Sequence, residues 1–208
     1  MANLLKRIKS SYRLIKYGLH APKLRPETIY QQYNAQILDL KESSSLDLGC
    51  GNNPRNPFGA SRAFGIDLFD QKITNVKVAD LSIEPIPFES ESLNYITAFD
   101  FIEHIPRILY CPQRTFPFVQ LMSEIYRCLK PGGYFFSHTP AYPYSPLFRD
   151  PTHVNYITEE TFGIYFDTQH GYAKNYGFRG GFNVLAEGWD GFTLISLLQK
   201  PLKATDTD

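Results

Sequence analysis

Residues 45–54, SLDLGCGNNP, decide the fold of this chain. Ser45 to Leu48 alternate in polarity as a short strand does, and Gly49 and Gly51 then allow a tight turn that a ligand can approach closely. A dinucleotide site would add a third glycine opening a helix, but Pro54 stands there. The pattern therefore predicts a ligand other than a dinucleotide at the carboxyl end of a strand.

Charge narrows the identity of that ligand. Asp47 lies two residues before the first glycine, where a carboxylate repels a pyrophosphate and attracts a cation. A sulfonium that also carries an α-ammonium group has the matching charge. We therefore expect S-adenosylmethionine as the cofactor, and a nicotinamide oxidoreductase remains the less favoured alternative.

Two further acids follow later apolar runs. Asp67 ends the run RAFGID, sixteen positions after Gly51, close to the distance at which α/β nucleotide sites place an acid on the ribose hydroxyls. Asp80 follows the next run, where a carboxylate can accept a hydrogen bond from an adenine amino group. We expect Asp67 and the adjacent Leu68 at the ribose, and Asp80 with Leu81 at the base.

Five motifs occur in order: DLGCG, GID, ADL, AFDFIEHI and LKPGG. Together they resemble the class I S-adenosylmethionine-dependent methyltransferase family over roughly residues 40 to 140. The resemblance implies an α/β, Rossmann-like fold with seven mostly parallel strands, a terminal antiparallel hairpin and helices on both faces. It also implies three groups of cofactor-binding residues: Asp47, Gly49, Cys50, Gly51 and Asn52 at the methionine part; Asp67, Leu68, Asp80 and Leu81 at the adenosine; Phe99 and Asp100 beside the sulfonium.

The segments GCGNNPRNPF and RDPTHVNYITEETF look most similar to small bacterial methyltransferases that modify glycans or surface-sugar precursors. This likeness implies O-methylation of a sugar, glycan or other small-molecule hydroxyl in surface polysaccharide biosynthesis. The chain departs from the family where Pro54, Pro57 and Gly59 leave little room for the usual first helix. We expect a loop there.

Apolar periodicity predicts the remaining elements. Helices are expected over residues 27–38, 116–129 and 158–165, the last capped by Thr158, and a hairpin over residues 182–187 and 192–198. This gives three regions: basic amphipathic or lid helices over residues 1–40, a methyltransferase domain over 41–203 and a tail over 204–208.

The first thirty residues carry a charge of +6, although the whole chain is neutral. We interpret this arm as a lid helix over the cofactor; contact of residues 1–25 with anionic lipid or a lipid-linked substrate is the second interpretation, and no nucleic acid is expected. Cys50, Cys111 and Cys128 lack a CxxC spacing, and no apolar run approaches a membrane span. We expect a cytoplasmic protein of undetermined oligomeric state.

Two histidines are the candidate catalytic residues. His104 follows the fourth apolar run and His153 follows the fifth, so both should lie near the carboxyl edge of the sheet. If the acceptor is a hydroxyl, one of them acts as general base, and His153 is preferred. Structural roles at a helix start or in a loop are the alternatives. No metal is expected; a metal interpretation would use Glu103, His104, Asp150 and His153.

Other functions leave different signatures. An enzyme that methylates an exocyclic base amine would usually show an Asn/Asp-Pro-Pro-aromatic run, but residues 99–102 are FDFI. A non-catalytic cofactor-binding scaffold that partners another transferase stays open, because the binding residues are clearer than the catalytic ones.

Overall fold

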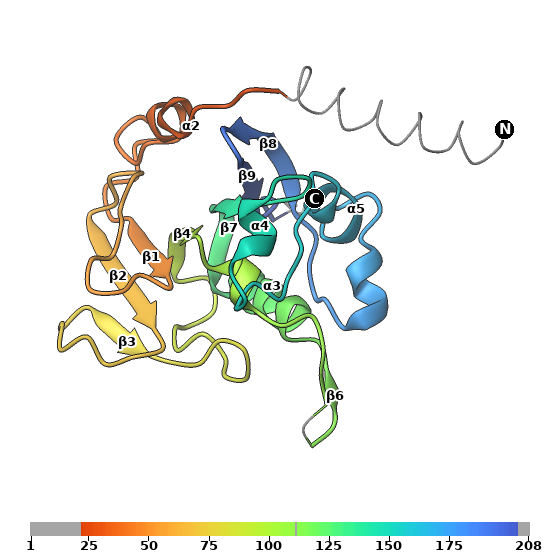
Figure 1. Cartoon of the computed structure of the whole chain (residues 1–208). Helices are drawn as coiled ribbons and strands as arrows, with labels where there is room; N and C mark the ends of the chain where they lie inside the picture. Colours follow the sequence, from red (N-terminus) through yellow and green to blue (C-terminus); the bar gives the residue numbers. More distant parts are fainter. Residues whose placement is uncertain (1–21, 111, 204–208) are drawn as a thin grey trace, which may run out of the picture.

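The computed structural model describes residues 22–110 and 112–203 (Figure 1). Its centre is a seven-stranded sheet in the order β3-β2-β1-β4-β7-β9-β8. The strands are β1 (Ser44–Leu48), β2 (Arg62–Asp67), β3 (Val76–Val78), β4 (Leu93–Phe99), β7 (Leu129–Pro140), β8 (Asn183–Asp190) and β9 (Thr193–Gln199). β1, β2, β3, β4 and β7 run parallel, whereas β9 pairs antiparallel with both β7 and β8. The expected fold, with its terminal antiparallel hairpin, is confirmed.

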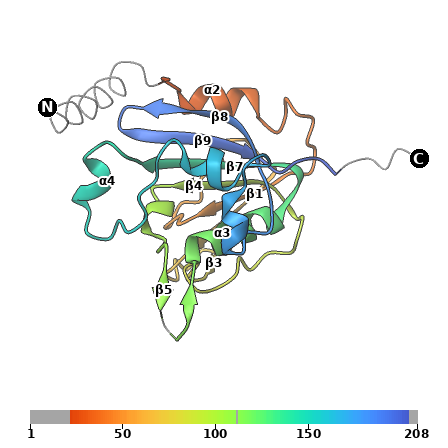
Figure 2. The same ribbon diagram turned by 90° about the vertical axis from the view of Figure 1, so that its right-hand side faces the viewer.

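Helices cover the two faces of this sheet, as Figure 2 shows: α2 (Pro26–Gln32) lies on one side and α3 (Pro117–Cys128) on the other. Shorter elements follow the carboxyl ends of β4 and β7. They are η1 (Ile102–His104), α4 (Pro146–Arg149), α5 (Thr161–Tyr165) and η2 (Tyr172–Tyr176). A small hairpin, β5 (Leu109–Tyr110) with β6 (Arg114–Thr115), projects away from the sheet.

Alternation along β4 builds the two cores. Ile96 belongs to the apolar cluster that contains Ile125 of α3, whereas its neighbour Tyr95 belongs to the cluster that contains Ile29 of α2. Successive side chains of a strand point to opposite faces, so one buried strand supplies both layers. The near-continuous burial of β4 is typical of a strand covered on both sides.

The loop between β1 and β2 takes the place of a first helix, as the prolines predicted. No helix is assigned between Gly49 and Ser61. Phe58 from this loop is fully buried and stacks on Tyr95 of β4, with ring centroids 4.8 Å apart and planes 5° from parallel. Aromatic burial of this kind stabilises the face that a helix would otherwise cover.

Two predicted helices have the wrong bounds. The helix expected over residues 27–38 ends at Gln32, since the Asn34 side chain accepts a bond from the Gln36 backbone and so competes with helix continuation. The helix expected from Thr158 starts at Thr161. The Thr158 hydroxyl accepts a bond from the Glu160 amide, 3.3 Å away, which forms a turn before the helix. The helix expected over residues 116–129 is confirmed as α3.

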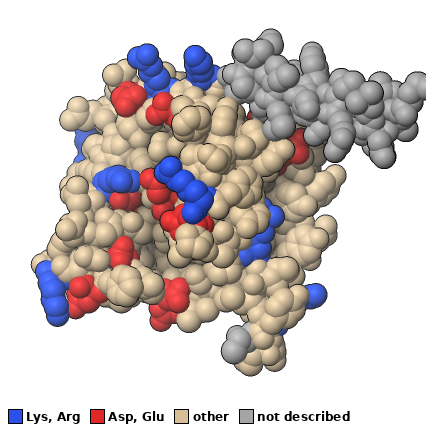
Figure 3. Space-filling view, in the orientation of Figure 1, with Lys and Arg blue, Asp and Glu red and all other residues tan. Residues whose placement is uncertain are grey.

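The predictions for residues 1–21 and for the tail fall outside the described residues. None of the described helices is long and apolar enough to cross a membrane. On the face in Figure 3, basic and acidic side chains of the described residues intermingle.

Candidate functional site

The glycine turn at the end of β1 is fastened to the end of β2. The backbone N–H groups of Gly49 and Cys50 both donate to the carbonyl of Ile66, at 2.9 and 3.1 Å. Gly49 and Gly51 have φ of +67° and +56°, a region that glycine adopts without strain. No described atom lies within 4 Å of the position that a Cβ would take at Gly51. The backbone of the turn therefore borders open space that a ligand can enter.

Asp47 lies beneath this turn and holds it in shape. Its side chain is 2% exposed; one oxygen accepts a bond from the Thr97 hydroxyl at 2.7 Å and the other from the Arg55 amide at 2.9 Å. Burial raises the pKa of Asp47. The sequence predicts this carboxylate beside the ligand; in the structure both of its oxygens accept hydrogen bonds from the protein. Thr97 was missed, although it lies opposite Asp47 in the strand register.

Asp67 connects the end of β2 to the turn. Its carboxylate accepts bonds from the amide of Gly51 at 2.8 Å, the amide of Phe69 at 3.1 Å and the side chain of Gln71 at 3.2 Å. A carboxylate has about four acceptor positions, so one stays free for a hydroxyl. Leu68 is 54% exposed beside it and offers an apolar surface. Asp67, predicted from the sequence to bind the ribose, therefore lies directly beside the glycine turn.

The remaining predicted binding residues follow β1, β3 and β4. Asn52 is exposed on the turn, and Asp80 is half-buried, accepting a bond from the Ser82 amide at 3.0 Å. Leu81 packs in the core, so only its backbone can face a ligand. Asp100 is exposed and has a φ of +48°.

Phe99, at the end of β4, lies below the Arg55 guanidinium, whose carbon is 4.4 Å from the ring centroid. Arg55 was not predicted from the sequence, because only the folded loop brings it over β4. The predicted residues nevertheless gather at the carboxyl ends of adjacent parallel strands, which is where open α/β sheets bind ligands.

The two candidate catalytic histidines lie side by side. His104 is in η1 and His153 is in the loop after α4, and their ring centroids are 4.8 Å apart with the planes at 77°. Glu103 precedes His104 and is fully buried. One donor atom from each of these three residues lies within 4.8 Å of the other two. The structure thus brings together the two histidines that the sequence predicts near the carboxyl edge of the sheet.

Hydrogen bonds fix which nitrogen of each ring is protonated. His153 Nδ1 lies 3.0 Å from the carbonyl of Leu147, which can only accept, so this nitrogen carries the proton. The Thr152 hydroxyl donates its proton to Asp150 at 2.6 Å, so His104 Nδ1, 3.0 Å from the same hydroxyl, must donate to it. In the neutral rings, both Nε2 atoms consequently present a lone pair.

Glu103 has an unusual environment for a carboxyl group. One oxygen accepts a bond from the Thr139 hydroxyl at 2.7 Å, and the other has no partner among the described residues. Burial raises the pKa of Glu103 to about 7. Nearby, burial lowers the pKa of His138, whose Nδ1 likewise has no partner among the described residues.

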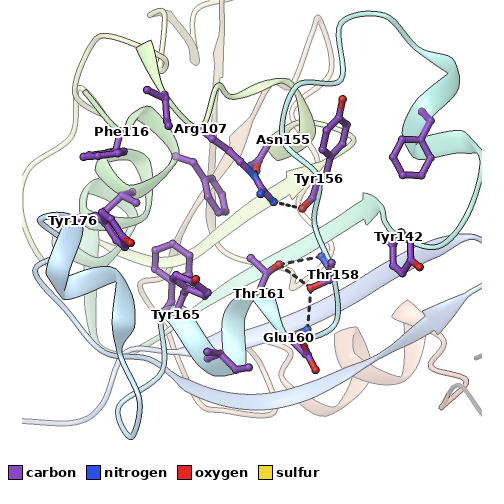
Figure 4. A pocket seen from close by; sticks show the side chains of 16 residues that line it. Arg107, Phe116, Tyr142, Asn155, Tyr156, Thr158, Glu160, Thr161, Tyr165 and Tyr176 are labelled. Atoms are coloured by element: carbon purple, nitrogen blue, oxygen red, sulfur yellow. Dashed lines mark hydrogen bonds between the residues drawn. The ribbon is translucent and has the colours of Figure 1, made fainter. Parts of the chain in front are cut away.

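A cavity of about 690 Å³ is lined by residues that follow η1, by the start of α3, by the segment after His153 and by α5 (Figure 4). None of the predicted cofactor residues lines it. Two residues of the cavity lining connect it to η1. Asn155 donates to the carbonyl of Ile102 in η1 at 2.9 Å and accepts a bond from Arg107 at 2.9 Å. The lining includes eight aromatic side chains: Phe116, Phe118, Tyr142, Phe148, Tyr156, Tyr165, Phe166 and Tyr176.

Comparison with known proteins identifies the family and the fold. A family described as a methyltransferase domain matches residues 23–174. An S-adenosylmethionine-dependent methyltransferase from Methanosarcina mazei has a TM-score of 0.53 at 17% identity, over 87% of this chain and 100% of that chain. The complex of a putative Haloferax volcanii methyltransferase with its Trm112 activator gives 0.53 at 14%, over 84% and 93%. The cyclase SpnF gives 0.55 at 12%, over 88% and 87%. No curated protein matches.

The chain therefore belongs to the methyltransferase-domain family, and its fold is that of the class I S-adenosylmethionine-dependent methyltransferases. S-adenosylmethionine is its cofactor, and it supplies an electrophilic methyl group. The predicted site is compatible with this molecule: space is open over the backbone of Gly51, and Asp67 and Asp80 stand at or just after the ends of successive strands. The low identities to solved structures show the fold alone.

Proposed function

We propose that the protein transfers the methyl group of S-adenosylmethionine to a hydroxyl of a sugar, glycan or other small molecule. The observation that carries this proposal is the aromatic cavity beside η1. Its volume of about 690 Å³ is within the range of small-molecule sites, and its lining combines many aromatic rings with few polar groups. Aromatic faces stack on the apolar faces of sugars and on planar rings, which suits an acceptor of this class.

Polar groups in the cavity can orient such an acceptor. Thr158 and Thr161 hydroxyls lie 3.3 Å apart at the start of α5, and Glu160 projects beside them (Figure 4). Arg107 is held by Asn155 and by the carbonyl of Tyr156, so it presents a fixed guanidinium. A few fixed polar groups within an apolar lining are what gives a small-molecule site its specificity.

The histidine pair supports a hydroxyl as the nucleophile. A hydroxyl must lose its proton as it attacks the methyl group, and the Nε2 lone pairs of His104 and His153 are available to receive it. Cofactor binding by the residues predicted from the motifs, from Asp47 to Asp100, supplies the alignment from which much of the rate of an in-line displacement comes.

Product analysis tests the acceptor class. The protein is incubated with S-adenosylmethionine carrying a labelled methyl group and with panels of sugar nucleotides, glycans and amines. We expect O-methylated products from the hydroxylic panel, identified by mass spectrometry. Methylation of amines alone would refute the proposal.

A variant pair locates the acceptor. Tyr156→Ala removes a ring from the cavity and should raise KM for the acceptor while leaving S-adenosylhomocysteine affinity unchanged. Tyr110→Ala removes an equally large ring from the projecting β5–β6 hairpin and serves as the control. An unchanged KM in Tyr156→Ala would place the acceptor elsewhere.

A second pair tests proton removal. His153→Asn or His104→Asn should lower turnover by roughly 10²- to 10⁴-fold with S-adenosylhomocysteine affinity nearly intact, since proton transfer belongs to the transition state. Near-normal turnover in both variants would leave alignment, or a carboxylate such as Asp100, as the source of catalysis. A non-catalytic scaffold with a protein partner is the alternative function. The methyltransferase of the Trm112 complex, which has a similar fold, binds a protein activator. Turnover with any acceptor excludes the scaffold.

A further inference from the structure

We propose that Glu103, His104 and His153 bind a divalent first-row transition-metal ion at the end of β4. The inference deepens the proposed function, because it gives the histidine pair a second way to activate an acceptor hydroxyl. The ion site itself follows from the chain's own donor atoms and can be tested without cofactor or acceptor.

The first argument is the separation of the donors. One atom from each residue lies within 4.8 Å of the others. Metal–nitrogen and metal–oxygen bonds of about 2.1 Å place donors on opposite sides of an ion about 4.2 Å apart, and neighbouring donors closer. Small rotations of the side chains therefore suffice to bring all three around one ion.

The second argument is the tautomer of both rings. Nδ1 of His153 donates to a backbone carbonyl, and Nδ1 of His104 donates to Thr152, which in turn donates to Asp150. Metal-binding histidines are usually held by such an outer partner, which leaves the second nitrogen free to ligate. Asp150 also places an oxygen 3.8 Å from Nε2 of His153 and so adds negative charge at the edge of the site.

The third argument is the buried Glu103 oxygen. This atom is inaccessible to solvent and has no partner among the described residues, and burying a polar group without a partner is costly. A cation would satisfy it. Two imidazoles with one carboxylate form a ligand set suited to Mn²⁺, Fe²⁺, Co²⁺ or Zn²⁺, with coordination positions left for an exogenous oxygen.

His170 differs from the two histidines of the proposed metal site, because its ring is already paired with a carboxylate. His170 Nδ1 lies 3.0 Å from the carboxylate of Asp167, so this partly exposed ring and its mostly buried acid form a satisfied pair. No comparable bond joins Glu103 to His104 or His153 among the described residues. Glu187 provides a comparable carboxyl: it is half-buried, accepts one side-chain bond from Ser196 and has a pKa raised to about 7. Among the described residues, it belongs to no candidate metal-binding cluster.

Calorimetric titration of the chelator-treated full chain with Mn²⁺ and with Zn²⁺ tests the site. We expect one ion per chain. Glu103→Gln and His153→Asn should each weaken binding by about 100-fold or more, and Thr152→Val, which removes only an outer partner, by about 10- to 100-fold. Glu187→Gln and His170→Asn are the matched controls, and their affinity should stay within about twofold of the unmodified chain.

Two results would overturn the inference: no saturable binding of either ion at millimolar concentration, or equal affinity in Glu103→Gln and Glu187→Gln. Circular dichroism checks that the variants fold. Because Thr152 is exposed, Thr152→Val gives a usable result even if the buried Glu103→Gln does not fold, and an unchanged affinity in Thr152→Val would also count against the site. A failure to bind the ion would refute the metal site but not the proposed methyl transfer. Conversely, an absence of methyl transfer would refute the proposed function but not the metal site.

Discussion

Replacement of Gly51 by alanine separates cofactor binding from folding. Gly51 has a φ of +56°, and Gly191, in the turn between β8 and β9, has a φ of +59°. No described atom lies within 4 Å of the added Cβ at either position. Both variants therefore introduce the same left-handed strain without a clash inside the protein, but only Gly51→Ala places a methyl group in the space over the cofactor turn.

The magnitudes follow from these two facts. An alanine in the left-handed region costs about 1–2 kcal/mol, so both variants should lose this amount of folding stability. Crowding of a close-fitting site by one methyl group costs about 1–3 kcal/mol. At 1.4 kcal/mol per tenfold change, Gly51→Ala should bind S-adenosylhomocysteine roughly 5- to 150-fold more weakly, whereas Gly191→Ala should bind it normally.

Urea unfolding and calorimetry with S-adenosylhomocysteine measure the two effects separately. Equal stability losses with an affinity loss at Gly51 alone would support the assignment of the turn. Equal cofactor affinity in the two folded variants would refute it.

Three further perturbations are predicted. Asp67→Ala should weaken S-adenosylhomocysteine affinity by about 1–3 kcal/mol in calorimetry. The control Asp70→Ala, which removes an exposed acid three residues later, should leave this affinity unchanged. Unchanged affinity in Asp67→Ala would place the ribose elsewhere. Burial raises the pKa of Glu187 from 4.5 to about 7, so its protonated form stabilises the fold at low pH and that contribution is lost as pH rises through about 7. The free energy of unfolding of Glu187→Gln should therefore rise relative to that of the unmodified chain by up to about 3 kcal/mol between pH 4.5 and 8. A stability difference between the two proteins that does not change with pH, measured by urea unfolding, would disprove it. Gly65→Ala should lower the free energy of unfolding by about 1–3 kcal/mol, because the new Cβ would clash with Cys50 Sγ. Adding Cys50→Ala should restore part of this stability in urea unfolding. Losses that simply add in the double variant would contradict the clash.

The strands and the cofactor turn were predictable from the sequence because they depend on local patterns. The run SLDLG, the acid of GID and the hairpin composition each predict their own conformation, and Pro54 and Pro57 correctly predicted a loop in place of a helix. Helix bounds were less predictable: Asn34 and Thr158 form side-chain bonds that end or delay a helix, and apolar periodicity does not register them.

Contacts across the sheet were not predictable from spacing. Thr97 lies 50 residues from Asp47, and the strand register alone brings the hydroxyl to the carboxylate. Likewise, the sequence placed Glu103, His104 and His153 at one edge of the sheet, but it did not show the unpartnered oxygen of Glu103 or the bonds that orient both imidazoles. Such details depend on tertiary packing and are visible only in the folded chain.

The central claim is that the predicted residues after β1, β2, β3 and β4, from Asp47 through Asp100, form an S-adenosylmethionine site. Calorimetric titration of the folded protein tests this claim most directly. We predict one saturable site each for S-adenosylmethionine and S-adenosylhomocysteine, and no heat of binding with NAD. No heat with either adenosyl ligand at millimolar concentration, or saturable binding of NAD, would contradict the account.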